Sequence, residues 1–209
     1  MMILKHIKNL PILAIYYHPL QYIFAFVITL ISLLIMLFEP ASGDWFRYQS
    51  IEINQGEWWR LLTANFCHSN WNHWLLNIAG LWLMEVFYQP VLSQKLRASL
   101  LLFCMVFSVF LMHLIMNIHW YVGLSGALHG YLIGGALLSW KQAKLLNAMI
   151  ILLTTSKLVA ELLWPINTAT EKLINANVLE EIHSFGAISS VVFFIGLYFL
   201  KQKKSVFHR

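Results

Sequence analysis

Six long apolar segments, separated by short polar stretches, constrain the fold of this chain more than any other feature of its sequence. At 1.5 Å per helical residue, each is about long enough to cross the roughly 30 Å hydrocarbon core of a bilayer. Only 11% of the residues are charged, against about a quarter in ordinary soluble domains. We therefore predict an all-α polytopic membrane protein with a single domain over residues 1–209. Its predicted spans run roughly over 20–38, 72–89, 98–118, 124–140, 145–164 and 182–200.

The positions of Lys and Arg predict the orientation. No small-residue cleavage site precedes the first apolar run, so we expect that run to remain as a helix. With a cytoplasmic N-terminus, ten Lys and Arg residues fall on the cytoplasmic side, three fall in outer loops, and Lys157 lies within the fifth span. The ten are Lys5, Lys8, Lys95, Arg97, Lys141, Lys144, Lys201, Lys203, Lys204 and Arg209, and the three are Arg47, Arg60 and Lys172. This bias predicts that both termini are cytoplasmic and that loops 39–71 and 165–181 lie outside.

The fourth apolar segment opens with a polar, glycine-rich sequence, GLSGALHG, at residues 123–130. Polar groups inside a bilayer are costly and therefore mark candidate functional sites. Ser125 lies at the predicted helix start, where unpaired backbone N–H groups can stabilise a developing negative oxygen. Gly126, Gly130 and Gly134 recur every four residues and predict close helix packing. The alternative is that Ser125 only caps a glycine-rich packing helix.

A histidine opens the sixth apolar segment, in the sequence HSFG that begins at His183. Gly186, Ala187 and Ser190 follow at helical spacing, so small side chains lie on the face that carries His183. We expect this face to pack on the glycines of the fourth segment. The alternative is a histidine that only lies at the membrane interface.

A third polar sequence, HSNWNHWLLN at residues 68–77, opens the second apolar segment. His73 and Asn77 are four residues apart, so they share one helix face and can both donate hydrogen bonds to one point. The alternative is that they are polar contacts between helices.

The predicted orientation places all three polar sequences at one membrane depth, because the second, fourth and sixth helices all begin at the outer face. A candidate nucleophile, a candidate base and two hydrogen-bond donors then lie together, as Ser–His chemistry requires. No Asp or Glu is obviously placed to orient His183, and Glu180 and Glu181 are expected in solvent. We therefore predict a Ser125–His183 dyad.

Four ordered motifs between Glu57 and about Ser190 resemble those of the rhomboid family of intramembrane proteases. They are Trp59-Arg60 for the family's WR motif, His68, His73 and Asn77 for H-x4-H-x3-N, Gly123 to Gly126 for GxSG, and His183 with Gly186 for HxxG. The resemblance implies a rhomboid-like bundle of six transmembrane helices. It also implies that Ser125 is the nucleophile, that His183 is the general base, and that His73, Asn77 and the Ser125 backbone N–H form the oxyanion hole. The supporting positions are His68, Gly123, Gly126, His129 and Gly186.

Three positions depart from the family pattern. The residue four beyond the serine is usually an aromatic that stacks on the base, and here it is His129. Ser190 stands where a glycine is usual, and Ile182 stands where a small residue usually precedes the base.

The compact chain and the sequence GLSGALHG are similar to the rhombosortase branch of the family. This resemblance implies a multi-pass protease of the bacterial inner membrane. Its substrates would be membrane-anchored proteins with a C-terminal Gly-Gly, a hydrophobic helix and a basic tail. We expect the lipid bilayer as a further partner, and we expect no nucleic acid, metal or cofactor.

Other functions remain open from the sequence. A general rhomboid protease would cleave other single-span proteins, and an inactive rhomboid-like protein would only bind membrane clients. A zinc site from His68, His73 and His129 lacks the HExxH spacing and its glutamate. A haem carrier would use His113 or His119.

Overall fold

A long helix lies at each of the six predicted spans in the computed structural model, which describes residues 19–164, 171–172 and 178–206. These helices are α3 (Ile23–Leu37), α7 (Trp71–Tyr88), α8 (Gln94–Ile115), α9 (Ser125–Leu138), α10 (Lys144–Leu163) and α12 (Glu181–Val206). A short 3-10 turn, η2 (Pro19–Tyr22), precedes α3. The predicted cytoplasmic segment 1–18, Arg209 and most of the predicted outer loop 165–181 lie outside the described residues.

The third helix begins earlier than predicted, at Gln94. Ser93 caps it, because the Ser93 hydroxyl oxygen accepts a hydrogen bond from the backbone N–H of Leu96 at 3.4 Å. The first turn of α8 therefore contains the charged residues that we expected in a loop.

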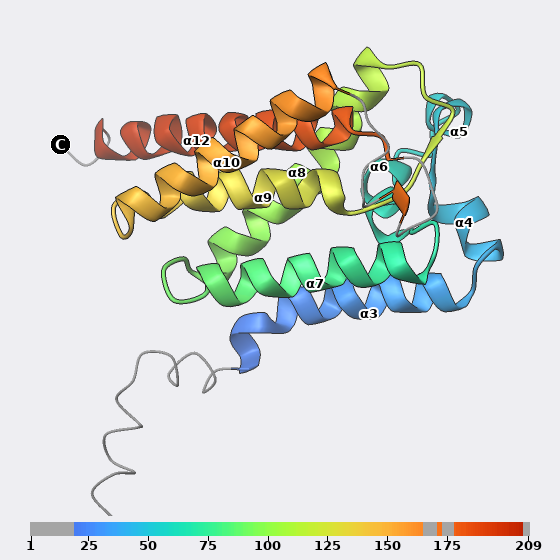
Figure 1. Cartoon of the computed structure of the whole chain (residues 1–209), viewed down its shortest axis with the longest axis horizontal. Coiled ribbons are helices and arrows are strands. Elements are labelled where there is room, and N and C mark those ends of the chain that lie inside the picture. Colours follow the sequence, from blue (N-terminus) through green and yellow to red (C-terminus); the bar gives the residue numbers. More distant parts are fainter. Residues whose placement is uncertain (1–18, 165–170, 173–177, 207–209) are drawn as a thin grey trace, which may run out of the picture.

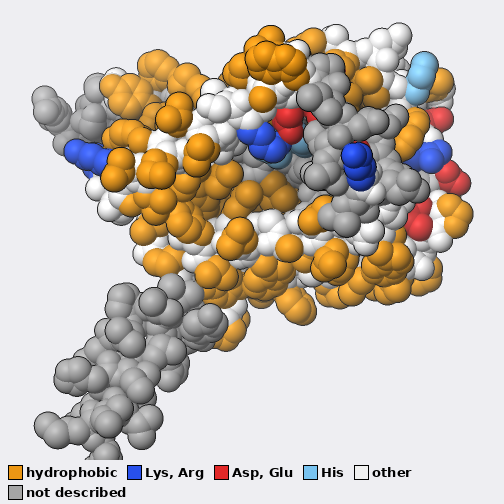
Figure 2. All heavy atoms as spheres, in the orientation of Figure 1, with side chains coloured by type: hydrophobic (Ala, Val, Ile, Leu, Met, Phe, Trp, Pro, Cys, Tyr) orange, Lys and Arg blue, Asp and Glu red, His pale blue; other side chains and the backbone are white. Residues whose placement is uncertain are grey.

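Four stretches within the described residues are long and apolar enough to cross a bilayer, namely Pro19–Leu37, Gln94–Ile115, Lys144–Leu163 and Glu181–Lys203. The other two long helices differ from these: α9 has only 14 residues, and α7 carries polar residues in its first turns and Glu85 near its end. Apolar side chains cover most of the surface along the length of the helices (Figure 2). The chain is thus a membrane protein with several apolar helices.

Helix α9 lies at the centre of the bundle and packs against α7, α8, α10 and α12 (Figure 1). The closest packing is between α9 and α12. A Cβ added to Gly130 would overlap the Gly186 carbonyl oxygen, and one added to Gly134 would lie 3.0 Å from the Ser190 Cβ. This contact confirms the expectation that the small-residue face of the sixth segment packs on the glycines of the fourth.

A buried ion pair joins the helices at the end of the bundle opposite to Ser125. Arg97 Nε lies 3.1 Å from Glu85 Oε2, and both side chains are almost fully buried. The Tyr131 hydroxyl donates to Glu85 Oε1 at 2.5 Å, and Arg97 also donates to the carbonyls of Leu92 and Gln21. Because buried charges are stable only when they are paired, this network fixes α7, α8, α9 and η2 relative to one another.

The long loop between α3 and α7 is folded rather than extended. It contains α4 (Ala41–Phe46), β1 (Tyr48–Gln49), α5 (Ser50–Asn54), α6 (Arg60–Thr63) and η3 (Ala64–Phe66). The buried Arg60 side chain contacts Glu57 Oε2 at 2.5 Å and donates to the carbonyls of Arg47 and Asp44 at 2.8 and 2.9 Å. The four tryptophans of this loop and of its junction with α7 are exposed: Trp45, Trp58, Trp59 and Trp71.

A two-stranded antiparallel sheet connects this loop to the segment that leads into α9. Tyr48 and Gln49 of β1 pair with Tyr121 and Trp120 of β2 (Trp120–Tyr121). Because β2 ends four residues before Ser125, the folded loop fixes the approach of the chain to that serine.

Candidate active site

Two hydrogen bonds fix the backbone of Gly123, two residues before Ser125. Gly123 has a φ of 129°, a conformation that L side chains rarely adopt. Its N–H donates to the Ala64 carbonyl at 3.0 Å, and its own carbonyl accepts from the Tyr121 hydroxyl at 2.7 Å. Leu124 is the N-cap residue, so Ser125 is the first helical residue of α9 and does not cap it. The alternative of a merely capping serine is therefore wrong.

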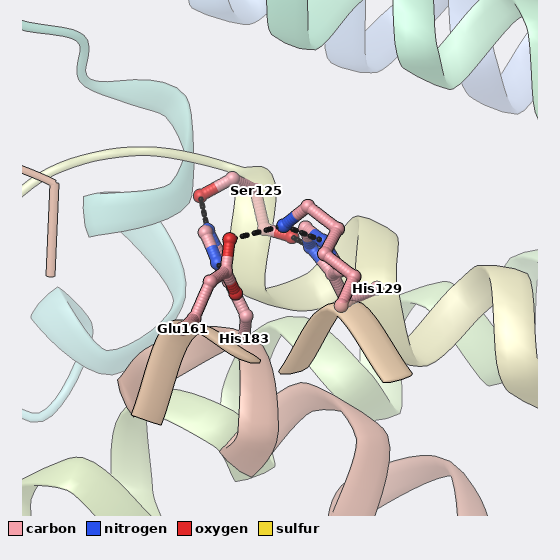
Figure 3. A network of polar contacts seen from close by, with 5 residues as sticks. Ser125, His129, Glu161 and His183 are labelled. Atoms are coloured by element: carbon pink, nitrogen blue, oxygen red, sulfur yellow. Dashed lines mark hydrogen bonds and ion pairs between the residues drawn. The ribbon is translucent and has the colours of Figure 1, made fainter. Parts of the chain in front are cut away.

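The structure brings His183 to Ser125 from 58 residues away in the sequence. His183 Nε2 lies 3.1 Å from Ser125 Oγ (Figure 3). The two helices can approach this closely because they meet at glycines: a Cβ on Gly186 would overlap the Gly126 carbonyl, and one on Gly126 would lie 2.9 Å from the Ile182 carbonyl oxygen. Ile182 itself is buried against Gly126, so its larger side chain is accommodated here.

A carboxylate lies next to His183, contrary to the expectation from sequence. Glu161 Oε2, on α10, lies 3.1 Å from His183 Nδ1, the ring nitrogen that does not face Ser125 (Figure 3). The Glu161 and His183 side chains are only 12% and 7% exposed. The expectation that no Asp or Glu faces His183 is therefore wrong, because α10 supplies an acidic group that the residues next to His183 in the sequence do not.

His129 stacks on His183, where the family pattern has an aromatic residue. The ring centroids are 4.1 Å apart and the planes are inclined by 23°. His129 Nδ1 lies 2.8 Å from the Ser125 carbonyl oxygen, and His129 Nε2 lies 3.1 Å from Lys157 Nζ. Lys157 also forms an ion pair with Glu161 Oε1. Since a carbonyl only accepts and an ammonium only donates, His129 carries its proton on Nδ1 and is neutral.

His73 presents a hydrogen-bond donor next to the segment that leads into Ser125. Its Nδ1 accepts from the Ser69 backbone N–H at 3.5 Å and lies 3.1 Å from the Ser69 hydroxyl. A backbone N–H only donates, so the proton of a neutral His73 lies on Nε2. A Cβ on Gly123 would lie 3.0 Å from that Nε2 atom. Gly123 thus leaves the space that the His73 ring needs.

Asn77 and His68 complete this side of the site. Asn77 is 5% exposed, and its Nδ2 has no hydrogen-bond partner among the residues that the structure describes. His68 Nδ1 donates to the Phe66 carbonyl at 3.2 Å, and its ring packs edge-on against His73 at 5.0 Å. Burial lowers the pKa of His68 to about 3, so it stays neutral and supports the His73 ring by packing.

A family model for the rhomboid domain matches residues 55–200, which is more than half of the chain. This chain belongs to the rhomboid family. Rhomboid proteins are generally serine intramembrane proteases that act on membrane proteins within the bilayer, and the family also has inactive members. A comparison with curated proteins gives no match.

In this rhomboid protein, sequence reasoning missed Glu161 and the part that Lys157 plays beside it. Both lie in a predicted span, where charged side chains are costly and mark candidate functional sites. Their spacing of four residues places them on one helix face. This combination marks them as candidates, but it does not identify the helix that they face.

The histidines of the alternative functions lie elsewhere or have other partners. His113 Nδ1 lies 3.0 Å from the Tyr48 hydroxyl near the C-terminal end of α8, and His119 is exposed. Among the described residues, no three His, Cys, Asp or Glu side chains come together in a way that could hold a metal ion.

Proposed function

We propose that this rhomboid protein is an active intramembrane serine endopeptidase in which Ser125 is the nucleophile and His183 is the general base. The observation that carries the proposal is the 3.1 Å approach of Ser125 Oγ to His183 Nε2. A serine and a histidine at this distance, on two helices that meet at glycines, form the nucleophile–base pair of covalent catalysis.

The reaction follows from this pair. His183 Nε2 takes the hydroxyl proton as Ser125 Oγ attacks the scissile carbonyl carbon, and the proton then passes to the leaving amine. Water then attacks the carbonyl carbon of the acyl-enzyme and gives a proton to His183 Nε2. That proton passes to Ser125 Oγ as the bond between Oγ and the carbonyl carbon breaks, which releases the acyl group. The developing oxyanion accepts hydrogen bonds from His73 Nε2–H, Asn77 Nδ2–H and the Ser125 backbone N–H. The buried Asn77 Nδ2, which has no hydrogen-bond partner within the described part of the chain, supports this assignment.

We further propose that all six long helices cross the membrane and that both termini are cytoplasmic. The 14 residues of α9 give about 21 Å at 1.5 Å per residue, less than the roughly 30 Å hydrocarbon core. We propose that α9 begins below the outer surface, so that Ser125 lies within the outer leaflet. A peptide bond at the outer end of a substrate helix would lie at the same membrane depth as Ser125.

The substrate that we propose is a membrane-anchored protein with a Gly-Gly next to a C-terminal helix and a basic tail. A scissile bond must be unwound, because a helical backbone holds its carbonyls in hydrogen bonds. Glycine weakens a helix interior by roughly 1 kcal/mol relative to alanine, and it lets a backbone approach a crowded serine. The basic tail would hold the helix end in the cytoplasm and leave the Gly-Gly at the outer face. Such clients place the enzyme in a bacterial inner membrane.

The test is a secreted reporter that carries this tail, coexpressed with the enzyme, with the Gly pair intact or changed to Leu-Leu. Ser125→Ala and His183→Ala should each abolish release, since removing one member of such a unit costs about 10⁶ in rate in a soluble serine protease. His119→Ala, an exposed histidine in an outer loop, is the control and should cleave normally. A fluorophosphonate should label Ser125 only while His183 is present.

Three results would change the proposal. Turnover by Ser125→Ala would exclude the serine mechanism. Equal release of the Leu-Leu reporter would favour a general rhomboid protease with other single-span substrates. No release and no label with the unaltered chain would indicate an inactive protein that binds membrane clients.

A further inference from the structure

We infer that Glu161 is a positioning residue of the proposed hydrolytic site, which makes it a Ser125–His183–Glu161 triad rather than a dyad. The inference rests on the proposed function. Its observation is independent, however, because Glu161 comes from a third helix, α10, and contacts the ring nitrogen that Ser125 does not use.

The contact determines which nitrogen of His183 carries the proton. A carboxylate only accepts hydrogen bonds, so Glu161 Oε2, at 3.1 Å, places the proton of the neutral ring on Nδ1. His183 Nε2 then presents a lone pair to the Ser125 hydroxyl at 3.1 Å. This is the tautomer that a general base needs, and the contact from Glu161 selects it.

Glu161 also opposes the charge that appears during the reaction. When the bond between Ser125 Oγ and the carbonyl carbon forms, the carbonyl electron pair moves to its oxygen and the hydroxyl proton moves to His183 Nε2. His183 then bears a positive charge with protons on both nitrogens. When the C–N bond breaks, the proton on Nε2 passes to the leaving amine. Glu161 remains a carboxylate throughout, since it stabilises the imidazolium and takes no proton.

Lys157 keeps the carboxylate charged and in place. The Glu161 side chain is 12% exposed, and removing a carboxylate from water costs free energy unless a cationic group pairs with it. Lys157, one turn earlier on α10, contacts Glu161 Oε1 and leaves Oε2 to face His183. The same ammonium donates to His129 Nε2 at 3.1 Å, so it also holds the ring that stacks on His183. One continuous hydrogen-bonded network thereby runs from the Ser125 carbonyl through the side chains of His129, Lys157, Glu161 and His183.

Glu161→Gln is the sharpest test, because it keeps the shape of the side chain and removes its charge. Lys157 will attract the amide oxygen, which leaves the amide NH₂ facing His183 Nδ1. That donor forces the ring proton onto Nε2, where it blocks the base. We expect kcat for the Gly-Gly reporter to fall by about 10²–10⁴, with KM nearly unchanged, by analogy with the aspartate of soluble triads. Labelling of Ser125 by a fluorophosphonate should slow to a similar extent.

The matched control is Glu181→Gln, which makes the same chemical change at the start of α12, two residues from His183 in the sequence. It should cleave like the unaltered enzyme. Glu161→Asp keeps the charge at a shorter reach and should have a kcat between those of the unaltered enzyme and Glu161→Gln. This ordering separates positioning of the base from a structural role. If Glu161→Gln fails to insert, Glu161→Asp is compared with the unaltered enzyme alone: a lower kcat at nearly unchanged KM supports the inference, and an unchanged kcat overturns it.

Two results would overturn the inference while leaving the proposed function intact: Glu161→Gln with kcat within about threefold of the unaltered enzyme, or Glu161→Asp no faster than Glu161→Gln. If the unaltered enzyme and Glu181→Gln neither cleave the reporter nor label at Ser125, the proposed function fails, and the inference fails with it.

Discussion

His73 and Asn77 show how two side chains on one helix face become candidates for a single task. His73 Nδ1 accepts from the Ser69 N–H, so Nε2–H is the donor of the neutral ring, while the buried Nδ2 of Asn77 has no partner among the described residues. A buried donor without an acceptor costs about 1–3 kcal/mol. An oxyanion that forms beside Asn77 would accept this hydrogen bond and offset that free energy, as expected for a preorganised site.

Asn77→Ala should therefore lower kcat by about 10²–10³ and change KM little, because the oxyanion exists only near the transition state. The measurement is steady-state cleavage of the Gly-Gly reporter in detergent. Asn54→Ala, which removes an exposed amide on α5 of the outer loop, is the control and should have no effect. Unchanged kcat with weaker substrate binding would assign Asn77 to helix packing instead.

The residues proposed for the site differed in how readily the sequence revealed them. Ser125, His183, His73 and Asn77 were predictable, because each is a polar group at the start of an otherwise apolar run. Glu161 was not selected, because a carboxylate four residues after a lysine also forms an ordinary ion pair along a helix. The packing of the six helices determines which face of α10 meets α12, and no local sequence pattern predicts that packing.

At the scale of elements, the approach of α12 to α9 decides whether Ser125 and His183 can meet. The contact is made by backbone atoms at Gly126, Gly130 and Gly186. A larger residue at one of these positions would meet backbone atoms, which cannot move aside as a side chain can. The sequence predicted this contact because small residues recur at helical spacing in both segments. It did not predict the start of α8, where the Ser93 cap extends the helix and brings Arg97 into the buried pair with Glu85.

Gly186→Ala should separate the two helices, because its Cβ would overlap the Gly126 carbonyl oxygen and a backbone atom cannot yield as a side chain does. Overpacking of this kind typically costs about 1–3 kcal/mol. We expect a lower thermal transition in detergent and loss of most cleavage. Gly196→Ala, on the same helix, is the matched control, since a Cβ there meets none of the described residues within 4 Å. Equal stability and activity of the two variants would show that α9 and α12 need no glycine contact.

Across the whole molecule, the candidate site lies at one end of the bundle, and the described Lys and Arg residues that were predicted to be cytoplasmic lie toward the other. The starts of α7, α9 and α12 lie together with the small helices of the loop between α3 and α7, while the described C-terminal end of α12 lies at the other end (Figure 1). Lys95, Lys141 and Lys144 lie at or next to the starts of α8 and α10, and all three are exposed. The orientation inferred from Lys and Arg and the position of the proposed site were derived from different residues, and the arrangement of the helices makes them compatible.

Labelling of single cysteines can test this orientation, with Gln55→Cys at the site end and Gln142→Cys at the opposite end as a matched pair. Both glutamines are exposed in the structure. The unaltered chain is the blank, because Cys67 and Cys104 are both buried and burial raises the pKa of the Cys67 thiol to about 12, which leaves little reactive thiolate. In intact cells, a membrane-impermeant maleimide should label Gln55→Cys at once and Gln142→Cys only after the inner face is opened. The positive-inside rule requires this order. The reverse order would place Ser125 on the cytoplasmic side, and a Gly-Gly junction held at the outer face by a basic tail could then not reach it.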